Sequence, residues 1–218
     1  MERVVVHVWS ELSSPRSYLG LLNLEEAARG RNVAVEHHAF IPAAADRGTA
    51  DEINELTARG IVLTDGYTPD SRSAQELVYA AKERGATPEE AAENGMAMAK
   101  TIHEAALLHG RDISSHTVLA ELGEEAGLDP TTIQAGLADG RWASPVDGDM
   151  ADAGRLRLER APVFLVAGMF SITGPAPAPD IAKVLETAGA ELTELTQAAV
   201  EEAREILAWK ASQEETDS

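Results

Sequence analysis

The sequence predicts an α/β protein in which strands lie near both ends of the chain and helices fill the middle. Short apolar runs of strand type occur around residues 3–40 and 162–173. Between them, about 110 residues show helix-start residues followed by apolar residues at helical spacing. A chain of 218 residues is long enough for one domain that carries an insertion.

The first 40 residues predict a strand, a helix and a second strand. Arg3–Trp9 is rich in valine on both faces, which is typical of a buried strand. Ser14 is a suitable N-cap and Pro15 a suitable first residue for the helix that follows and ends near Gly30. Val33–Phe40 alternates and predicts the second strand. We expect the two strands to be parallel, joined by a right-handed crossover.

The middle of the chain predicts a series of helices that begin at capping residues. Their expected starts are Thr49 with Glu52, Ser73 with Glu76, Thr87 with Pro88, Ser115, and Asp129 with Pro130. Farther on, Asp147, Asp149 and Asp152 lack the glycine and the final glutamate of a calcium loop. We interpret them as a solvated acidic stretch.

The last part predicts a hairpin and a helix. Pro162–Val166 and Met169–Thr173 flank the turn residues Ala167 and Gly168. A helix is expected to start at Pro179. The order β-α-β, helices, β-β-α is that of a thioredoxin-like fold with a large α-helical insertion.

This order also predicts how the chain is divided. Residues 1–40 and 159–190 would form the thioredoxin-like domain, residues 41–158 the helical insertion subdomain, and residues 191–218 a C-terminal helix and tail. Apolar residues recur at helical spacing from Leu192 to Leu207. Two alternatives are open for this stripe: it packs on its own domain, or it joins two chains in a homodimer.

The charge balance excludes some partners. Lys and Arg number 18 against 37 Asp and Glu, a net charge of −19. Without a basic cluster, we expect no binding to nucleic acid or to an anionic membrane. Without a signal peptide or an 18-residue apolar run, we expect a cytoplasmic protein. The negative net charge does not exclude a small anionic substrate, because a helix N-terminus binds anions locally.

The residue types also limit the chemistry. The absence of cysteine excludes disulfides, Cys-zinc sites, iron–sulfur clusters and thiol nucleophiles. None of the six histidines forms an H-x-x-x-H or HExxH motif, so we expect no metal site. His7 is interpreted as a core residue, and His37 and His38 should point to opposite faces of their strand.

Three stretches carry a family resemblance. They are WSELSSPRSYLG from Trp9, GRDISSHTVLAELGEEAGLD from Gly110, and APVFLVAGMFSITG from Ala161. They resemble the N-terminal motif, the insertion helices and the cis-proline region of DsbA-like thioredoxin-fold proteins, in particular the cytoplasmic FrnE-type branch. The resemblance implies that Pro162 is cis and exposes the backbone of Ala161, beside Arg160, to an extended ligand. This branch resembles proteins encoded with polyketide pathways, which implies an aromatic or polyketide-like substrate.

The sequence departs from that family at its reactive positions. Ser14 and Ser17 stand where the family has the cysteines of its C-x-x-C motif, and Arg16 stands in the tryptophan position. A hydroxyl does not exchange disulfides, so thiol–disulfide chemistry is excluded at this site. A label of oxidoreductase would describe the ancestry of the chain.

The segment from Ser14 to Leu19 also resembles S-P-Y-S-[WY]-L of kappa-class glutathione transferases and 2-hydroxychromene-2-carboxylate isomerase. This resemblance implies that Ser14 hydrogen-bonds the sulfur of glutathione or another low-molecular-weight thiol. A hydrogen bond to a charged group contributes about 1.5–3 kcal/mol, and each ~1.4 kcal/mol lowers a thiol pKa by about one unit. The segment after the hairpin, Gly174–Pro177, lacks the polar group that those enzymes use for the γ-glutamyl end.

We therefore expect Ser14 to be the catalytic residue. The expected ligand-binding residues are Arg16, Ser17, Arg160, Ala161 and Pro162. Alternatives remain open for three of these positions: Ser14 as a structural cap, Pro162 as a residue that preserves the fold, and Arg16 as the partner of an anion or of Glu11.

Two functions are compatible with these residues. One is a non-redox isomerase-like or transferase-like enzyme that acts on a small molecule between the subdomains. The other is a non-catalytic ligand-binding or assembly protein. An open cleft that Ser14 and Arg16 face favours the enzyme, and a cleft filled by side chains favours the second function.

Overall fold

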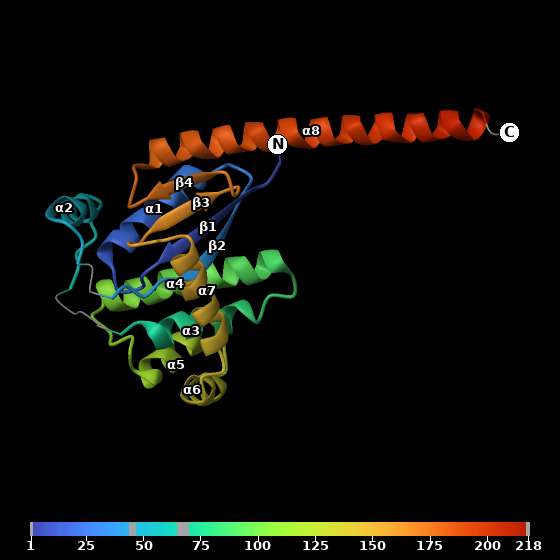
Figure 1. Ribbon diagram of the computed structural model, residues 1–218. Coiled ribbons are helices and arrows are strands. Elements are labelled where there is room, and N and C mark those ends of the chain that lie inside the picture. The colour runs from blue at the N-terminus through green and yellow to red at the C-terminus, as the bar shows by residue number, and fades with distance from the viewer. Residues whose placement is uncertain (1, 44–46, 65–69, 217–218) are drawn as a thin grey trace.

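The computed structural model describes residues 2–43, 47–64 and 70–216, without the side chains of residues 205–216. Within this part of the chain, four strands and eight helices follow one another (Figure 1). Their bounds are β1 Val4–Ser10, α1 Pro15–Ala28, β2 Val33–Ala39, α2 Ala50–Ala58, α3 Arg72–Lys82, α4 Pro88–Leu107, α5 His116–Glu125, α6 Pro130–Ala138, α7 Ala143–Arg155, β3 Val163–Val166, β4 Phe170–Thr173 and α8 Ala178–Thr216.

The strands form one mixed sheet in the order β2-β1-β3-β4. β1 pairs with β2 in parallel and with β3 antiparallel, and β3 pairs with β4 antiparallel. The parallel crossover and the hairpin expected from the sequence are therefore confirmed. The helices α2–α7 lie between β2 and β3 in the chain, which confirms the α/β architecture with a large helical insertion.

Helix α1 belongs to two apolar cores. Leu21 and Leu24 pack with the sheet residues and with α8. Tyr18 and Leu19 pack with the helices of the insertion. The loop before α1 adds Leu12 to the second core. The N-terminus of α1 is consequently held by both parts of the fold.

Two helices differ from the sequence-based expectation. Helix α3 begins at Arg72 after Ser71, so the capping box expected from Ser73 and Glu76 is wrong. Helix α7 was not predicted, and the acidic residues assigned to a solvated stretch lie in it. Asp149 is buried, with 6% of its surface exposed, and hydrogen bonds from residues of β2 and α3 offset the cost of burying its charge.

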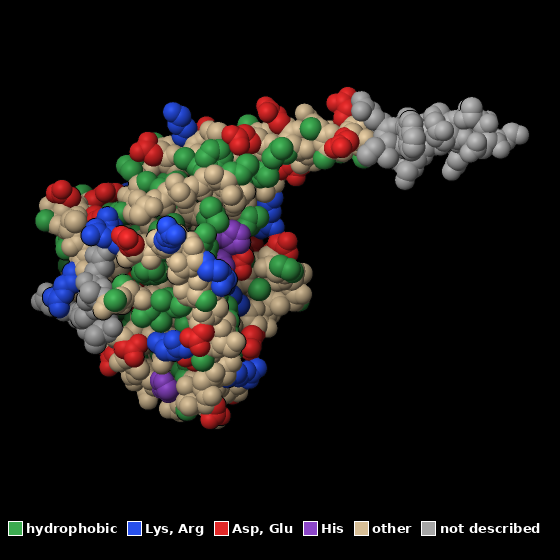
Figure 2. Space-filling model, viewed as in Figure 1, with side chains coloured by type: hydrophobic (Ala, Val, Ile, Leu, Met, Phe, Trp, Pro, Cys, Tyr) green, Lys and Arg blue, Asp and Glu red, His purple; other side chains and the backbone are tan. Residues whose placement is uncertain are grey.

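The C-terminal segment is one helix of 39 residues, α8, where the sequence suggested two segments. Its first part packs on the sheet through Ile181 and Leu185. Beyond Leu192 the helix extends past the sheet, and Leu195 and Val200 are 60% and 46% exposed (Figure 1). Figure 2 shows hydrophobic side chains on the edge of α8 that faces the sheet and acidic ones on its outer edge.

These exposed residues bear on the two alternatives for the C-terminal stripe. Helix α8 packs on the sheet of its own domain only as far as Leu192. The homodimer through the later part of α8 stays a prediction. No helix in the described part of the chain is both long and apolar enough to cross a membrane.

Candidate functional site

The loop between β1 and α1 is closed by hydrogen bonds from backbone N–H groups to two serine hydroxyls. Ser14 is the N-cap of α1, and its hydroxyl accepts a hydrogen bond from the Ser17 N–H at 3.3 Å. The Ser17 hydroxyl accepts one from the Glu11 N–H at 3.1 Å. Both serines are fully buried by their neighbours. The cap confirms the predicted start of α1, and it fixes the position of the Ser14 hydroxyl.

A buried carboxyl group lies in the same loop. Oε1 of Glu11 accepts hydrogen bonds from the Ser13 N–H at 3.0 Å and from the Ser13 hydroxyl at 2.8 Å. Oε2 accepts one from the hydroxyl of Ser71, which precedes α3, at 3.0 Å. Burial raises the pKa of Glu11, and the hydrogen bonds from the two serines act in the opposite direction. Sequence reasoning missed this link between the loop and the insertion.

Arg16 connects α1 to the start of α2. Its Nε lies 3.2 Å from Oε1 of Glu52. Glu52 also completes the predicted capping box, since its Oε2 accepts a hydrogen bond from the Thr49 N–H at 2.7 Å. Of the alternatives left open for Arg16, a carboxylate partner is found, and it is Glu52; Glu11, named as an example, accepts hydrogen bonds from Ser13 and Ser71. A Cβ placed on Gly174 would lie 3.5 Å from the Arg16 guanidinium, so Arg16 lies between α2 and the end of β4.

The peptide bond between Ala161 and Pro162 is cis, as the resemblance implied. Pro162 packs against α1 at Gly20, where an added Cβ would come within 2.5 Å of the Pro162 Cγ. The Pro162 carbonyl accepts a hydrogen bond from the Gly174 N–H at 2.8 Å. This packing places the preceding residue, Ala161, opposite the N-terminus of α1.

A pocket of about 470 Å³ lies where these segments meet, which we call the Ser14 pocket. It is open to solvent and formed by the start of α1, the end of β2, the start of α2 and the segment before β3. The lining residues are Glu11, Ser14, Arg16, Phe40, Pro42, Ala43, Gly48, Thr49, Glu159, Arg160 and Ala161.

Four of the six residues expected at the site line this pocket together: Ser14, Arg16, Arg160 and Ala161. Ser17 and Pro162 lie behind it, where they fix the loop and pack on α1. Their role as ligand contacts stays a prediction. Arg160 is exposed, and it makes no ion pair with any residue that the structure describes.

The Ser14 pocket has charged groups of both signs in its lining, Arg16 and Arg160 together with Glu11 and Glu159. The hydroxyl of Ser14 already accepts from Ser17, and among the described residues nothing accepts its proton. This proton is available to a ligand that reaches the Ser14 side chain, which lines the pocket but is itself fully buried. The N-terminus of α1 stabilises an anion at this point, and Arg160 adds a cation at the rim. The volume lies within the range of about 300–1,000 Å³ that is usual for small-molecule sites.

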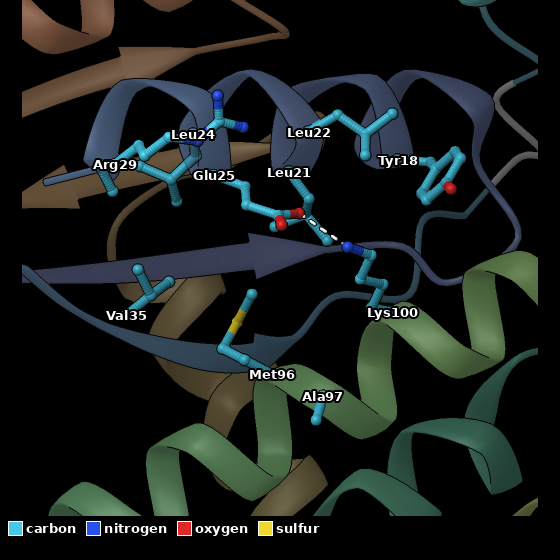
Figure 3. A pocket seen from close by; sticks show the side chains of 11 residues that line it. Tyr18, Leu21, Leu22, Leu24, Glu25, Arg29, Val35, Met96, Ala97 and Lys100 are labelled. Carbon is cyan, nitrogen blue, oxygen red and sulfur yellow. Dashed lines mark hydrogen bonds and ion pairs between the residues drawn. The ribbon is translucent and has the colours of Figure 1, made fainter. Parts of the chain in front are cut away.

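A second pocket, also of about 470 Å³, runs between α1, β2 and α4 (Figure 3). Its lining is mostly apolar, and the ion pair between Glu25 and Lys100, 2.8 Å long, joins α1 to α4 across it. Tyr18 lies at one end and donates to Glu104 at 3.3 Å. Burial raises the pKa of Tyr18 to about 12, so its hydroxyl is not a base near neutral pH. We call this the α1–α4 pocket.

Solved structures support the fold assignment. The probable DsbA oxidoreductase SCO1869 from Streptomyces coelicolor aligns with a TM-score of 0.74 and 23% identity, over 87% of this chain and 91% of that one. A 2-hydroxychromene-2-carboxylate isomerase aligns with a TM-score of 0.66 and 17% identity, over 89% and 98%. The cytosolic disulfide reductase DsbM from Pseudomonas aeruginosa aligns with a TM-score of 0.61 and 19% identity, over 89% and 99%. Identities this low show the fold alone.

Comparison of the sequence itself identifies the family. Curated protein sequences give no match. A family model, the DSBA-like thioredoxin domain, matches residues 5–186. This range includes the sheet except for Val4, the insertion and the residues of the Ser14 pocket. The chain is thus a member of the DSBA-like thioredoxin domain family, with serines in place of the reactive cysteines and no cysteine elsewhere among its 218 residues.

Proposed function

We propose that this chain is a non-redox enzyme, isomerase-like or transferase-like, that acts on a small aromatic or polyketide-like molecule in the Ser14 pocket. Glutathione or another low-molecular-weight thiol serves as its cofactor. Without cysteine, the chain has no thiol of its own with which to exchange disulfides. Its chemistry therefore depends on a thiol or a substrate that the pocket binds.

The observation that carries the proposal is the open pocket at the N-terminus of α1, with Ser14 and Arg160 on its wall. A thiolate placed there would accept a hydrogen bond from the Ser14 hydroxyl and lie at the positive end of the helix dipole. The backbone of Ala161, next to the cis-proline, faces the same space. Arg160 would bind a carboxylate of the thiol or of the substrate.

One structural neighbour supports the choice of an isomerase, and another supports the choice of a thiol. One is named as 2-hydroxychromene-2-carboxylate isomerase. The other, DsbM, has also been solved with GSH, and that structure aligns with a TM-score of 0.57 and 19% identity. An isomerase and a protein that binds glutathione thus share this fold. In this chain, the N-terminus of α1 holds a buried serine, Ser14, as its N-cap.

A thermal-shift titration tests the proposal. Glutathione, other small thiols and a set of aromatic acids would be added to the full chain and to Ser14→Ala. A ligand at 100 times its Kd stabilises by about 2.7 kcal/mol, which moves the midpoint by several degrees. We expect a shift with at least one thiol and its loss in Ser14→Ala. Ser115→Ala is the matched control, because Ser115 also precedes a helix but lies outside the pocket.

The α1–α4 pocket favours a second candidate, a non-catalytic protein that binds a small apolar molecule. Its lining is mostly aliphatic, and two of its three ionic groups, Glu25 and Lys100, are paired with each other; the third is Arg29. Ala97 lines this pocket on α4, so Ala97→Trp would fill it (Figure 3). A ligand shift that Ala97→Trp abolishes and Ser14→Ala leaves intact would support this candidate over the enzyme.

A further inference from the structure

Three side chains with metal-binding donors lie on one face of the sheet. In the parallel ladder His7 of β1 is opposite Glu36 of β2, and Trp9 is opposite His38. Alternate residues of a strand share a face, so His7, Glu36 and His38 lie on the same face. Figure 2 shows histidine side chains at the surface beside these strands, below α8. The interpretation of His7 as a core residue is wrong, since its side chain is 34% exposed.

The donor atoms converge on one point. Nδ1 of His7 lies 2.9 Å from Nε2 of His38 and 3.5 Å from Oε2 of Glu36. All three donor atoms are within 4.8 Å of one another. A proton on His7 Nδ1 can form a good hydrogen bond with only one of its two neighbours, His38 Nε2 or Glu36 Oε2. A cation between the three atoms would bind all of them. Two imidazole nitrogens and one carboxylate oxygen are a ligand set that suits Zn²⁺.

A second carboxylate fixes the orientation of His38. Oδ1 of Asp149 lies 2.7 Å from Nδ1 of His38, and its Oδ2 accepts hydrogen bonds from the Ala39 N–H and the Tyr79 hydroxyl. The proton on His38 Nδ1 then points to Asp149, and the lone pair on Nε2 points to His7. A carboxylate that holds a histidine in this way is the usual support of a metal-ligating imidazole. Asp149 comes from α7, far from β2 in the sequence.

The three side chains are open to solvent on one side, and carboxylates surround them. His7 and Glu36 have 34% and 41% of their side chains exposed, while His38 has 15%, so one side is open to solvent and to a water ligand. The negative charges of Glu36 and Asp149 offset the positive charge of the nearby Lys82. Its ammonium group donates to the His37 carbonyl at 2.6 Å and lies over the ring of Tyr79.

We propose that His7, Glu36 and His38 bind one divalent transition-metal ion of the Zn²⁺ class, with Asp149 as the positioning residue for His38 and water as the remaining ligand. The expectation of no metal site was based on motifs within one short segment. This site is instead assembled from two neighbouring strands, which brings together residues about 30 positions apart. The proposal is independent of the Ser14 pocket, which these three residues do not line.

Calorimetric titration of the untagged full chain with ZnCl₂ tests the proposal. We expect one equivalent to bind and His7→Gln and Glu36→Gln each to weaken binding at least ten-fold. Both side chains are partly exposed, so these variants should keep the fold. His109→Gln is the matched control, because His109 is exposed on the insertion; its affinity should equal that of the unaltered chain.

Asp149→Asn tests the positioning role. A carboxylate behind a ligating histidine typically contributes 10–100-fold in metal affinity, so we expect a loss of that size with the stoichiometry unchanged. Co²⁺ gives a second readout, since the ring of Trp9 stacks on His38 with centroids 4.5 Å apart and its fluorescence should be quenched. The proposal is overturned if the unaltered chain binds no saturating equivalent of Zn²⁺, or if His7→Gln and Glu36→Gln bind it as tightly as the unaltered chain.

Discussion

Arg16 and Glu52 form an ion pair, 3.2 Å from Nε to Oε1, that joins the first helix of the sheet domain to the first helix of the insertion. Both side chains are largely buried, at 20% and 11% exposed. The same glutamate caps α2 through the Thr49 N–H. One carboxylate thus positions both Arg16 and α2 at the edge of the Ser14 pocket, so the pocket depends on contacts between the two parts of the fold.

Replacing Glu52 by glutamine separates the two functions of this carboxylate. Glutamine can still complete a capping box, but it loses the charge that binds Arg16. A hydrogen bond to a charged group contributes about 1.5–3 kcal/mol, so we expect Glu52→Gln to lower the free energy of unfolding in urea by about that amount. Glu55→Gln, which removes an exposed pair with Arg59 on the same helix, should cost less than about 1 kcal/mol. Equal losses in the two variants would contradict the role assigned to Glu52.

Gly20 is where α1 approaches the cis-proline most closely. A Cβ at this position would lie 2.5 Å from Cγ of Pro162 and 3.2 Å from Cζ of Phe164. We expect Gly20→Ala to lower the free energy of unfolding by about 1–3 kcal/mol, the usual cost of overpacking. Gly148→Ala in α7, where nothing lies within 4 Å, should instead raise it by about 0.5–1 kcal/mol. If Gly20→Ala were as stable as Gly148→Ala, the close packing of α1 on Pro162 would be refuted.

His103 makes the stability depend on pH. Burial lowers its pKa to about 3 from an ordinary value of 6.5. Between these values the unfolded chain binds a proton that the folded chain does not, so this residue makes the free energy of unfolding fall as the pH falls, by up to ~1.4 kcal/mol per unit. His103→Leu removes this contribution. Relative to the unaltered chain, we expect the variant to gain stability as the pH is lowered from 6 to 4.

Urea unfolding at several pH values measures this difference. His109→Gln, at an exposed position, is the control. A stability difference between His103→Leu and the unaltered chain that stays constant from pH 6 to pH 4 would show that His103 is not held neutral in the fold.

A thiol placed at position 14 should ionise readily. Cysteine at a helix N-terminus beside a cation has its pKa lowered from about 8.5 to between roughly 3.5 and 7.5, and Ser14 caps α1 next to Arg16. Because the chain has no cysteine, Ser14→Cys introduces a single thiol whose ionisation can be followed by absorbance at 240 nm. We expect a pKa at least about one unit below that of Ser171→Cys, an exposed site on β4 away from any helix start. Similar values for the two thiols would show that the α1 N-terminus does not stabilise a thiolate.

The parts of the fold that depend on local sequence were predictable. Ser14 with Pro15, Thr87 with Pro88, and Asp129 with Pro130 begin helices as expected, because capping and a proline at the first position act over three or four residues. The hairpin turn at Ala167 and Gly168 is equally local. Four of the eleven residues that line the Ser14 pocket were expected together at one site, through the family resemblance at two distant segments; their contact with a ligand stays a prediction.

The features that were missed depend on contacts between distant residues. Helix α7 contains two glycines and several aspartates, which are weak helix formers, and it is held by the buried residues Val146, Asp149 and Ala153. The pairing of Asp149 with His38 spans 111 positions, and that of Arg16 with Glu52 spans 36. No local pattern reveals either contact. In α8, the helix continues through Gly189, since one glycine costs only about 1 kcal/mol in a helix.

The absorbance of glutathione at 240 nm, titrated with pH in the presence of the full chain, tests the proposed enzyme site most directly. If Ser14 and the α1 N-terminus bind the sulfur, a hydrogen bond of about 1.5–3 kcal/mol should lower the thiol pKa of bound glutathione by about one to two units. Ser14→Ala should abolish this change, and Ser115→Ala should retain it. Glutathione that ionises with its ordinary pKa in the presence of saturating protein, or equally in the Ser14→Ala variant, would contradict a thiol site in the Ser14 pocket.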